Sequence, residues 1–161
     1  MEFGSAPTRL RGTPSWLINQ TALAASRLVT DALSRVGARR PHYAVLAALE
    51  EFGPASQADL ARRCGIDRSD MVAVISELEA ARYLERGPNP HDRRRNLVRI
   101  TTAGRDRLHV LDQVVRAVQD ELLAALTPAE REELTRMLTA VVRHHRPAAG
   151  ADGDDASRHR R

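Results

Sequence analysis

The chain of 161 residues contains no lysine, so apart from its histidines every basic side chain is an arginine. A single cysteine, Cys64, excludes an intrachain disulfide and a cysteine-rich metal site. Aromatic residues make up only 3 % of the sequence, so a core must be built mainly from leucine, valine and alanine, which favours helices. No apolar run approaches the ~20 residues that span a bilayer, and no signal-peptide pattern opens the chain, so we expect a cytoplasmic protein with no membrane contact.

Residues 56–80 carry the pattern of two successive helices joined by a tight turn. Ser56 and Asp59 have the S-x-x-D spacing of a capping box, which predicts a helix start, and Gly65 is placed to end that helix. Asp67 is expected to cap the second helix, in which apolar residues recur at helical spacing from position 71 to position 78. A helix, a turn and a helix in this order can place the second helix in the major groove of DNA.

A short β-hairpin is predicted directly after these helices. Residues 84–86 and 96–101 have the pattern of strands, and the proline-containing stretch 88–92 between them is a turn that cannot stay helical. Residues 82–99 contain six arginines and two carboxylates, a net +4 that equals the formal net charge of the whole chain. Because arginine suits phosphates and narrow minor grooves, the hairpin favours contact with nucleic acid. The alternative is a solvated hairpin whose charge serves solubility.

Three stretches of the sequence together match one family. They are the helix-turn-helix sequence of residues 56–86, the motif Asp92-Arg93-Arg94 followed by Ile100-Thr101, and Thr102-Ala103-Gly104 at the start of the next helix. With these the sequence resembles the MarR family of bacterial winged-helix transcriptional regulators, over about residues 14–146. The resemblance implies a mainly α fold with a small β-hairpin wing, a winged helix-turn-helix flanked by N- and C-terminal dimerisation helices.

Helices are predicted on both sides of this unit. One begins at Thr13-Pro14 and ends near residue 36, another occupies residues 40–52, and the longest runs from residue 102 to residue 126. Thr127, Pro128 and Glu130 form a capping box that begins the last helix. The expected organisation is a disordered segment 1–12, dimerisation helices 13–36 and 102–146, a DNA-binding domain 37–101 and a disordered tail 147–161.

Apolar residues on the longest helix step by three and four positions: Leu108, Leu111, Val115, Val118 and Leu122. This 3.5-residue spacing is typical of helices that pair along their length. Together with the resemblance it predicts a homodimer formed by the flanking helices; the alternative is packing within one subunit. A two-fold dimer would bind a pseudo-palindromic site of double-stranded DNA with its recognition helices about 34 Å apart.

DNA contacts are predicted at the starts of the two helices and in the wing. The residues are Ser56, Gln57, Arg68, Ser69, Asp70, Met71, Asp92, Arg93, Arg94 and Arg95. Arg68 and Ser69 can donate hydrogen bonds to base edges or phosphates, whereas Asp70 has an alternative role as the capping partner of Asp67. The resemblance implies that Arg94 enters the minor groove and that Asp92 orients it.

The resemblance also implies a small aromatic effector, bound between the dimerisation helices and the winged helix, that weakens DNA binding. Trp16, Asn19, His42 and Tyr43 are placed by their order in the chain to line such a site, and Trp16 could stack on an aromatic ring. The alternative is that Trp16 and Tyr43 only pack in an interface.

The sequence offers less support for other functions. Cys64 lies on an apolar stripe without a second cysteine, which favours a structural thiol over a redox switch. His144 and His145 are adjacent rather than four residues apart, and no catalytic motif is present, so we predict no metal, cofactor or catalytic residue. The prediction is a homodimeric repressor released by a small molecule. The alternatives are a winged-helix protein-interaction module and a metal- or redox-responsive regulator.

Overall fold

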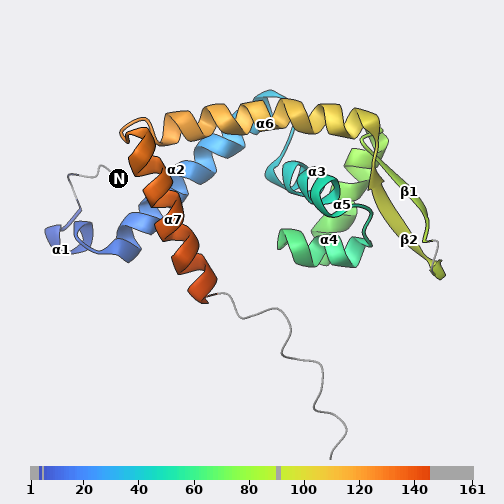
Figure 1. The fold of residues 1–161 in the computed structure, drawn as a ribbon, viewed down its shortest axis with the longest axis horizontal. Coiled ribbons are helices and arrows are strands. Elements are labelled where there is room, and N and C mark those ends of the chain that lie inside the picture. The colour runs from blue at the N-terminus through green and yellow to red at the C-terminus, as the bar shows by residue number, and fades with distance from the viewer. Residues whose placement is uncertain (1–3, 5, 90–91, 146–161) are drawn as a thin grey trace, which may run out of the picture. The chain divides into compact units, whose positions relative to one another are not determined.

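The structure, a computed structural model, describes residues 4, 6–89 and 92–145, with only the backbone described at residues 89 and 92–95. The chain forms two compact units, Met1–Leu122 and Leu123–Arg161. The first contains α1 (Thr8–Arg11), α2 (Pro14–Arg35), α3 (Arg40–Phe52), α4 (Gln57–Cys64), α5 (Arg68–Ala80), β1 (Leu84–Asn89), β2 (Asp92–Ile100) and α6 (Thr102–Leu122), and the second contains α7 (Pro128–His145) (Figure 1). The prediction of a mainly helical fold with one small hairpin is confirmed. Within the described ranges no helix is both long and apolar enough to cross a membrane.

The helix ends of the first unit lie close to the positions that the sequence predicts. α4 begins after Ser56 and ends at Gly65, whose φ of 63° is the left-handed conformation that glycine adopts most readily. α1 was not predicted, because residues 8–11 belong to a segment that was expected to be disordered. The N–H groups of Leu10 and Arg11 donate to the carbonyl of Pro7, at 2.9 and 3.2 Å, and these local bonds close the single turn.

β1 and β2 pair antiparallel, with Leu84 opposite Ile100, and both are longer than predicted. β1 continues to Asn89 and β2 begins at Asp92, with a register shift between Pro88 and Asn89. Proline has no N–H to donate to the ladder, which accounts for irregular pairing at this point. Residues 90–91, the centre of the predicted turn, lie outside the described residues.

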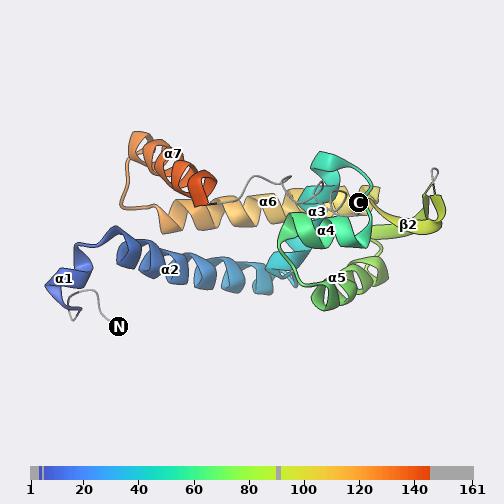
Figure 2. The ribbon, with the colours of Figure 1, turned by 90° about the horizontal axis from the view of Figure 1, so that it is seen from below.

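The core of the first unit is centred on α3. Val45, Leu46 and Leu49 of α3 are almost completely buried and pack with apolar residues of α4, α5, the hairpin and α6. Away from the hairpin, α6 packs on α2, and the two helices lie side by side in Figure 2. The helix-turn-helix and the hairpin therefore share one core with both flanking helices of this unit.

The predicted seam of α6 is covered within the chain. Leu108, Leu111 and Val118 are 6, 0 and 4 % exposed, where α6 packs on α2 and α3. The interpretation of this seam as a dimer surface is therefore wrong for these three residues, because their side chains are already buried. Exposed large apolar side chains of the flanking helices lie elsewhere, and they include Leu17, Ile18 and Leu23 on α2 and Met137, Leu138, Val141 and Val142 on α7.

α6 ends at Leu122 rather than at the predicted residue 126, and the second unit begins at the next residue, Leu123. The carbonyl oxygens of Leu123 and Leu126 both accept from Nε of Arg131, at 3.1 and 3.2 Å, which stabilises a turn in place of a further helical turn. The predicted capping box of α7 is confirmed, since the Thr127 N–H donates to Glu130 Oε2 at 2.8 Å and the Glu130 N–H to Thr127 Oγ1 at 3.4 Å. The Thr127 N–H, and then the Thr127 hydroxyl, which donates to the same carboxylate oxygen at 2.7 Å, lower the pKa of Glu130.

Candidate nucleic-acid interface

The N-terminus of α4 is held by Ser56. Its Oγ accepts from the Asp59 N–H at 3.2 Å and donates to Asp59 Oδ2 at 2.7 Å, while Arg62 donates to the same carboxylate. The Ser56 hydroxyl and then Arg62 lower the pKa of Asp59. Ser56 and Gln57 are both half-buried. Because the Ser56 hydroxyl and the Asp59 N–H are engaged in this cap, the amides left for a phosphate at this end are those of Gln57 and Ala58.

The N-terminus of α5 differs from this arrangement. Asp67 occupies the N-cap position, as predicted, but its side chain accepts no cap hydrogen bond. The expected pairing of Asp67 with Asp70 is therefore absent, and Asp70 is exposed beside Arg68 and Ser69. The first amides of α5 thus have no side-chain acceptor from the N-cap residue, which leaves donors at the start of the helix for an external group.

Met71 is buried, which corrects its prediction as a DNA-binding residue. It is 0 % exposed and lies in the core beside Val74, which is 2 % exposed. A side chain buried in this way cannot contact DNA, so its prediction as a DNA-binding residue is wrong. The error has a simple cause, since Met71 belongs to the apolar stripe that continues through Ile75 and Leu78.

The outward face of α5 lies opposite that stripe. At 100° per residue it contains Ser69, Val72, Ala73 and Ser76, all of which are exposed. The sequence prediction extended only to position 71 and left Val72, Ala73 and Ser76 out of the site. The helical spacing of the buried residues was a sufficient signal to find them.

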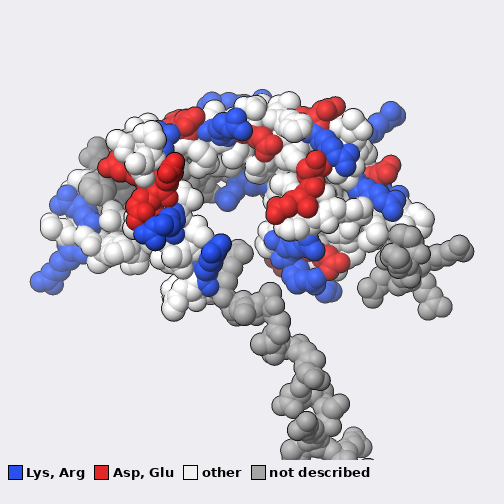
Figure 3. All heavy atoms as spheres, in the orientation of Figure 1, with Lys and Arg blue, Asp and Glu red and all other residues white. Residues whose placement is uncertain are grey.

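Two further arginines lie at the end of α4. Arg62 is 74 % exposed, and Arg63 stacks over the ring of Phe52 at 4.5 Å from its centroid. Figure 3 shows arginine side chains gathered over α4 on the face in view. The sequence prediction did not include Arg62 or Arg63, although two adjacent arginines next to the turn were a visible signal.

The hairpin is fixed to the helix-turn-helix at its base. Ala55, just before α4, forms an isolated bridge with Val98, with N–H to O distances of 3.2 and 2.9 Å. Arg86 of β1 pairs with Glu79 of α5 at 3.0 Å and donates to Ser76 Oγ at 3.5 Å. The predicted wing residues Asp92, Arg93, Arg94 and Arg95 lie in β2, but their side chains are outside the described part of the chain.

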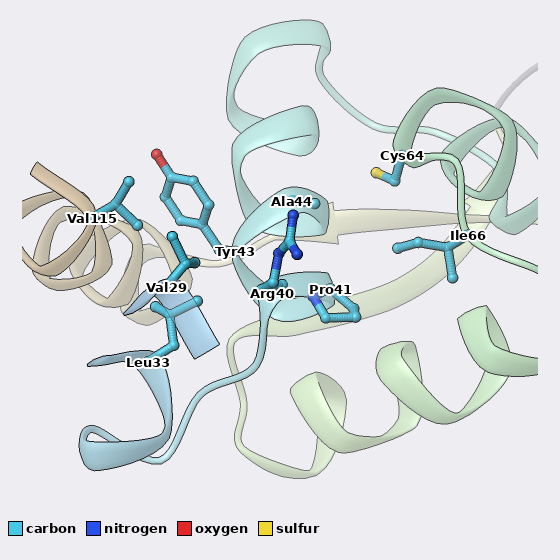
Figure 4. A pocket seen from close by; sticks show the side chains of 9 residues that line it. All are labelled: Val29, Leu33, Arg40, Pro41, Tyr43, Ala44, Cys64, Ile66 and Val115. Carbon is cyan, nitrogen blue, oxygen red and sulfur yellow. The ribbon is translucent and has the colours of Figure 1, made fainter. Parts of the chain in front are cut away.

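A cavity of about 380 Å³ lies where the helix-turn-helix meets α2, α3 and α6. Its lining is mostly apolar and comes from α2, α3, α6, the end of α4 and the turn after it: Val29, Leu33, Arg40, Pro41, Tyr43, Ala44, Cys64, Ile66 and Val115. Figure 4 shows Arg40, Pro41 and Ala44 in the middle, with Tyr43 and Val115 on one side and Cys64 and Ile66 on the other. Arg40 donates to Ser26 Oγ at 3.1 Å. A cavity of this size and character suits a small, largely apolar molecule with one anionic group.

The four predicted ligand residues do not surround this cavity together. Tyr43 lines it, and its hydroxyl donates to Asp112 Oδ1 at 3.0 Å; burial, and then this bond, raise the pKa of Tyr43. His42 lines a different cavity of about 220 Å³, and Trp16 and Asn19 line neither of the two. His42 instead links two helices, since Nδ1 accepts from the Arg39 N–H at 3.3 Å and Nε2 contacts Glu77 Oε2 at 2.8 Å.

The thiol of Cys64 is half-buried at the edge of the larger cavity. Burial raises the pKa of Cys64, and the neighbouring Arg63 opposes this only in part. A raised thiol pKa lowers the thiolate fraction at neutral pH, which is the opposite of what a redox sensor needs. Across the described ranges no three histidine, cysteine, aspartate or glutamate residues are grouped to hold a metal ion.

Comparison with known proteins identifies the family to which the chain belongs. The sequence model of the MarR family matches residues 36–95. The HTH-type transcriptional repressor Rv2887 of Mycobacterium tuberculosis is 32 % identical over 110 residues, which cover 68 % of this chain and 79 % of that protein. The chain belongs to the MarR family. Its winged helix, α4, α5 and the β1–β2 hairpin, is thus the characteristic part of a MarR protein.

Two solved MarR structures match over most of the chain, and one further repressor matches over part of its sequence. The structure of E. coli MarR complexed with operator DNA superposes with a TM-score of 0.68 at 26 % identity, covering 78 % of this chain and 91 % of that one. The structure of Rv2887 with p-aminosalicylic acid gives a TM-score of 0.68 at 27 % identity, covering 81 and 99 % of the two chains. The repressor NicR of Pseudomonas putida is 26 % identical over 62 % of this chain, which spans 63 % of NicR's length.

Proposed function

We propose that this MarR protein is a transcriptional repressor that binds a pseudo-palindromic DNA operator as a homodimer. The observation that carries the proposal is the exposed outward face of α5, which begins with Arg68 and Ser69 and is flanked by an arginine-rich hairpin. A helix of this kind fits the major groove, and the hairpin then lies over the adjacent minor groove. The E. coli MarR structure with operator DNA supports it by similarity. A protein with this role works in the cytoplasm, and we assign it no catalytic activity.

The proposed DNA contacts follow from the exposed groups. Arg68 and Ser69 would contact base edges or phosphates, and the first-turn amides of α4 after Ser56 would hold a phosphate. Arg94 would enter the minor groove with Asp92 orienting it, while Arg93 and Arg95 hold phosphates. Asp70 would need a cytosine N4 amino group or an arginine beside it, because its carboxylate repels phosphate.

The proposed domain organisation is a DNA-binding domain of residues 37–101 between dimerisation helices 13–36 and 102–146. The exposed apolar side chains of α7 support this proposal, because Met137, Leu138, Val141 and Val142 share one helical face and are 38–52 % exposed. In the proposed two-fold dimer the two copies of α5 would lie about one DNA turn apart, roughly 34 Å.

The proposed effector is a small aromatic acid bound in the 380 Å³ cavity. Residues of α2, α3, α6 and the end of α4 line it, so an occupant would contact both the helix-turn-helix and a flanking helix. Arg40 offers the charge for a carboxylate and Tyr43 an aromatic wall. Rv2887 with p-aminosalicylic acid supports this class of ligand by similarity. A coupling of 1–3 kcal/mol is typical of such effectors, a change of roughly five- to 150-fold in DNA affinity.

Fluorescence anisotropy of the protein with its upstream intergenic DNA and a scrambled duplex, at several salt concentrations, tests the proposal. We expect binding about 10³-fold or more tighter to the native duplex, with a steep decrease as salt rises. Arg68→Ala and Arg94→Ala should each weaken binding, and a lost phosphate contact lowers the salt slope by about 1. Arg116→Ala, which removes an exposed arginine of α6, is the matched control. Equal and weak binding to both duplexes would instead support a protein-interaction module.

A further inference from the structure

The recognition helix α5 exposes a large apolar side chain on its outward half. Val72 is 48 % exposed, whereas the other large apolar residues of α5, Met71, Val74, Ile75 and Leu78, are at most 3 % exposed. Burying a side chain of this size is favourable by about 1.5–3 kcal/mol relative to leaving it in water. Val72 is therefore available to be covered by a partner at the surface where DNA is proposed to bind.

The neighbours of Val72 limit what that partner can be. On the outward half of α5 the residues around it are small and uncharged, namely Ser69, Ala73 and Ser76. Asp70 and Glu77 lie together on the far edge of this face, at 100° per residue, and Glu77 is paired with Arg39 and His42. Arg68 lies one turn before Val72 on the near edge. The surface is thus an apolar spot beside a cation, with the nearest carboxylates turned aside.

Bases in the major groove present one group that matches such a spot. The thymine C5-methyl is the apolar feature of that groove, and apolar side chains contact it. The residues of a recognition helix that reach base edges lie in its N-terminal part, and Val72 is one turn inside the start of α5. We propose that Val72 determines specificity by contacting a thymine methyl in each half-site of the operator. The inference rests on the proposed DNA-binding function.

The contact should have a measurable and modest effect. Removing one methyl-sized group from an apolar contact weakens binding by about four-fold at 25 °C. In a two-fold symmetric complex the same contact is made twice, so loss at both half-sites should weaken binding by roughly 15-fold. Deoxyuridine in place of thymidine removes only the methyl and leaves the hydrogen-bonding edge of the base unchanged.

The experiment begins by selecting duplexes from a randomised pool with the full-length protein. Each thymine of the selected duplex is then replaced by deoxyuridine, and Kd is measured for wild type, Val72→Ala and a matched control, Val110→Ala. Val110 is also 48 % exposed but lies on α6. We expect one thymine per half-site at which deoxyuridine weakens wild type and Val110→Ala by about four-fold and leaves Val72→Ala unchanged.

The possible outcomes distinguish failure of the Val72 assignment from failure of the proposed DNA-binding function. A site at which every deoxyuridine substitution affects wild type and Val72→Ala equally, or a selected site without thymine, overturns the assignment of Val72 while leaving DNA binding intact. If no duplex is enriched and binding equals that of scrambled DNA, the proposed function itself fails. Because Val72 is 48 % exposed and is not one of the buried core residues, its replacement by alanine should leave the fold unchanged, and the Tm of the variant checks this.

Discussion

Replacing Gly104 by alanine sets two opposing effects against each other. Gly104 is buried in the first turn of α6, and its N–H donates to Thr101 Oγ1 at 3.0 Å. Alanine is favoured over glycine inside a helix by about 1 kcal/mol, so helix propensity alone predicts a more stable protein. A Cβ at this position would, however, lie 2.1 Å from the carbonyl oxygen of Tyr83 and 2.8 Å from Cγ1 of Ile100.

The steric effect should win. The closest neighbour is a backbone atom, and it would have to move by roughly 1 Å to restore ordinary contact. Such a movement costs about 2–3 kcal/mol, the upper part of the range for an overpacked core, which exceeds the propensity gain of about 1 kcal/mol. Tyr83 also accepts the Thr101 N–H at 3.1 Å, so the movement would strain the junction of hairpin and helix. We expect Gly104→Ala to lower the free energy of unfolding by about 1–2 kcal/mol and the Tm by roughly 2–8 °C.

The assay is urea unfolding followed by circular dichroism at a fixed protein concentration, because dimerisation makes stability concentration-dependent. Gly12→Ala is the matched control, since a Cβ there meets its nearest atom, the Thr8 carbonyl oxygen, at an ordinary 3.8 Å and φ is −89°. It should change stability by no more than about 0.5 kcal/mol. A Gly104→Ala protein as stable as wild type, or more stable, would show that α6 does not approach Tyr83 as described.

Three further outcomes follow from the caps and titrating groups. Ser56→Ala should reduce stability by about 0.5–2 kcal/mol, measured by urea unfolding, because α4 loses its cap; no change would contradict the cap assignment. The His42 contact, and then Arg39, lower the pKa of Glu77, so its contribution is complete above the ordinary glutamate pKa of about 4.3 and is lost as pH falls through the lower folded value. The stability difference between wild type and Glu77→Gln should therefore shrink below about pH 4, and a difference that grows there would refute the pairing. Because burial raises the pKa of Cys64, alkylation of the native thiol at pH 7.5 should be slower than that of the urea-unfolded chain, and a faster reaction would revive the redox alternative.

Local signals allowed most of the fold to be predicted. The caps at Ser56 and Thr127 and the stop at Gly65 act through hydrogen bonds and backbone conformations within a few residues, so the sequence contains them in full. The end of α6 could not be predicted in this way. Arg131 captures the carbonyls of Leu123 and Leu126 from the following helix, and nothing between residues 122 and 126 signals that contact.

The site was predicted less completely than the fold, for a physical reason. A 3.5-residue apolar spacing states that a helix face is covered but not what covers it, and in α6 the cover for Leu111 is the same chain rather than a second copy. The prediction of Met71 as a DNA contact is wrong for a related reason: the residue lies near the start of α5, but its direction around the helix places it on the buried stripe. Trp16 and Asn19 were placed by chain order, which does not determine which side chains meet around a cavity.

The hydrogen bonds that join the elements indicate how effector binding would change DNA binding. Thr101 Oγ1 donates to the Arg82 carbonyl at 2.8 Å and the Thr101 N–H to Tyr83, which ties the end of α5, the hairpin and the start of α6 together. Val98 of β2 is paired with Ala55, just before α4. Because this bridge also connects the hairpin to the helix-turn-helix, we expect the winged helix to move as one rigid unit. A ligand between α2, α3, α6 and the end of α4 would therefore change the spacing of two whole winged helices rather than reshape either one. Weaker operator binding with unchanged protection of the α4–α5 amides in hydrogen exchange is the expected signature, and ligand-induced exposure of those amides would contradict it.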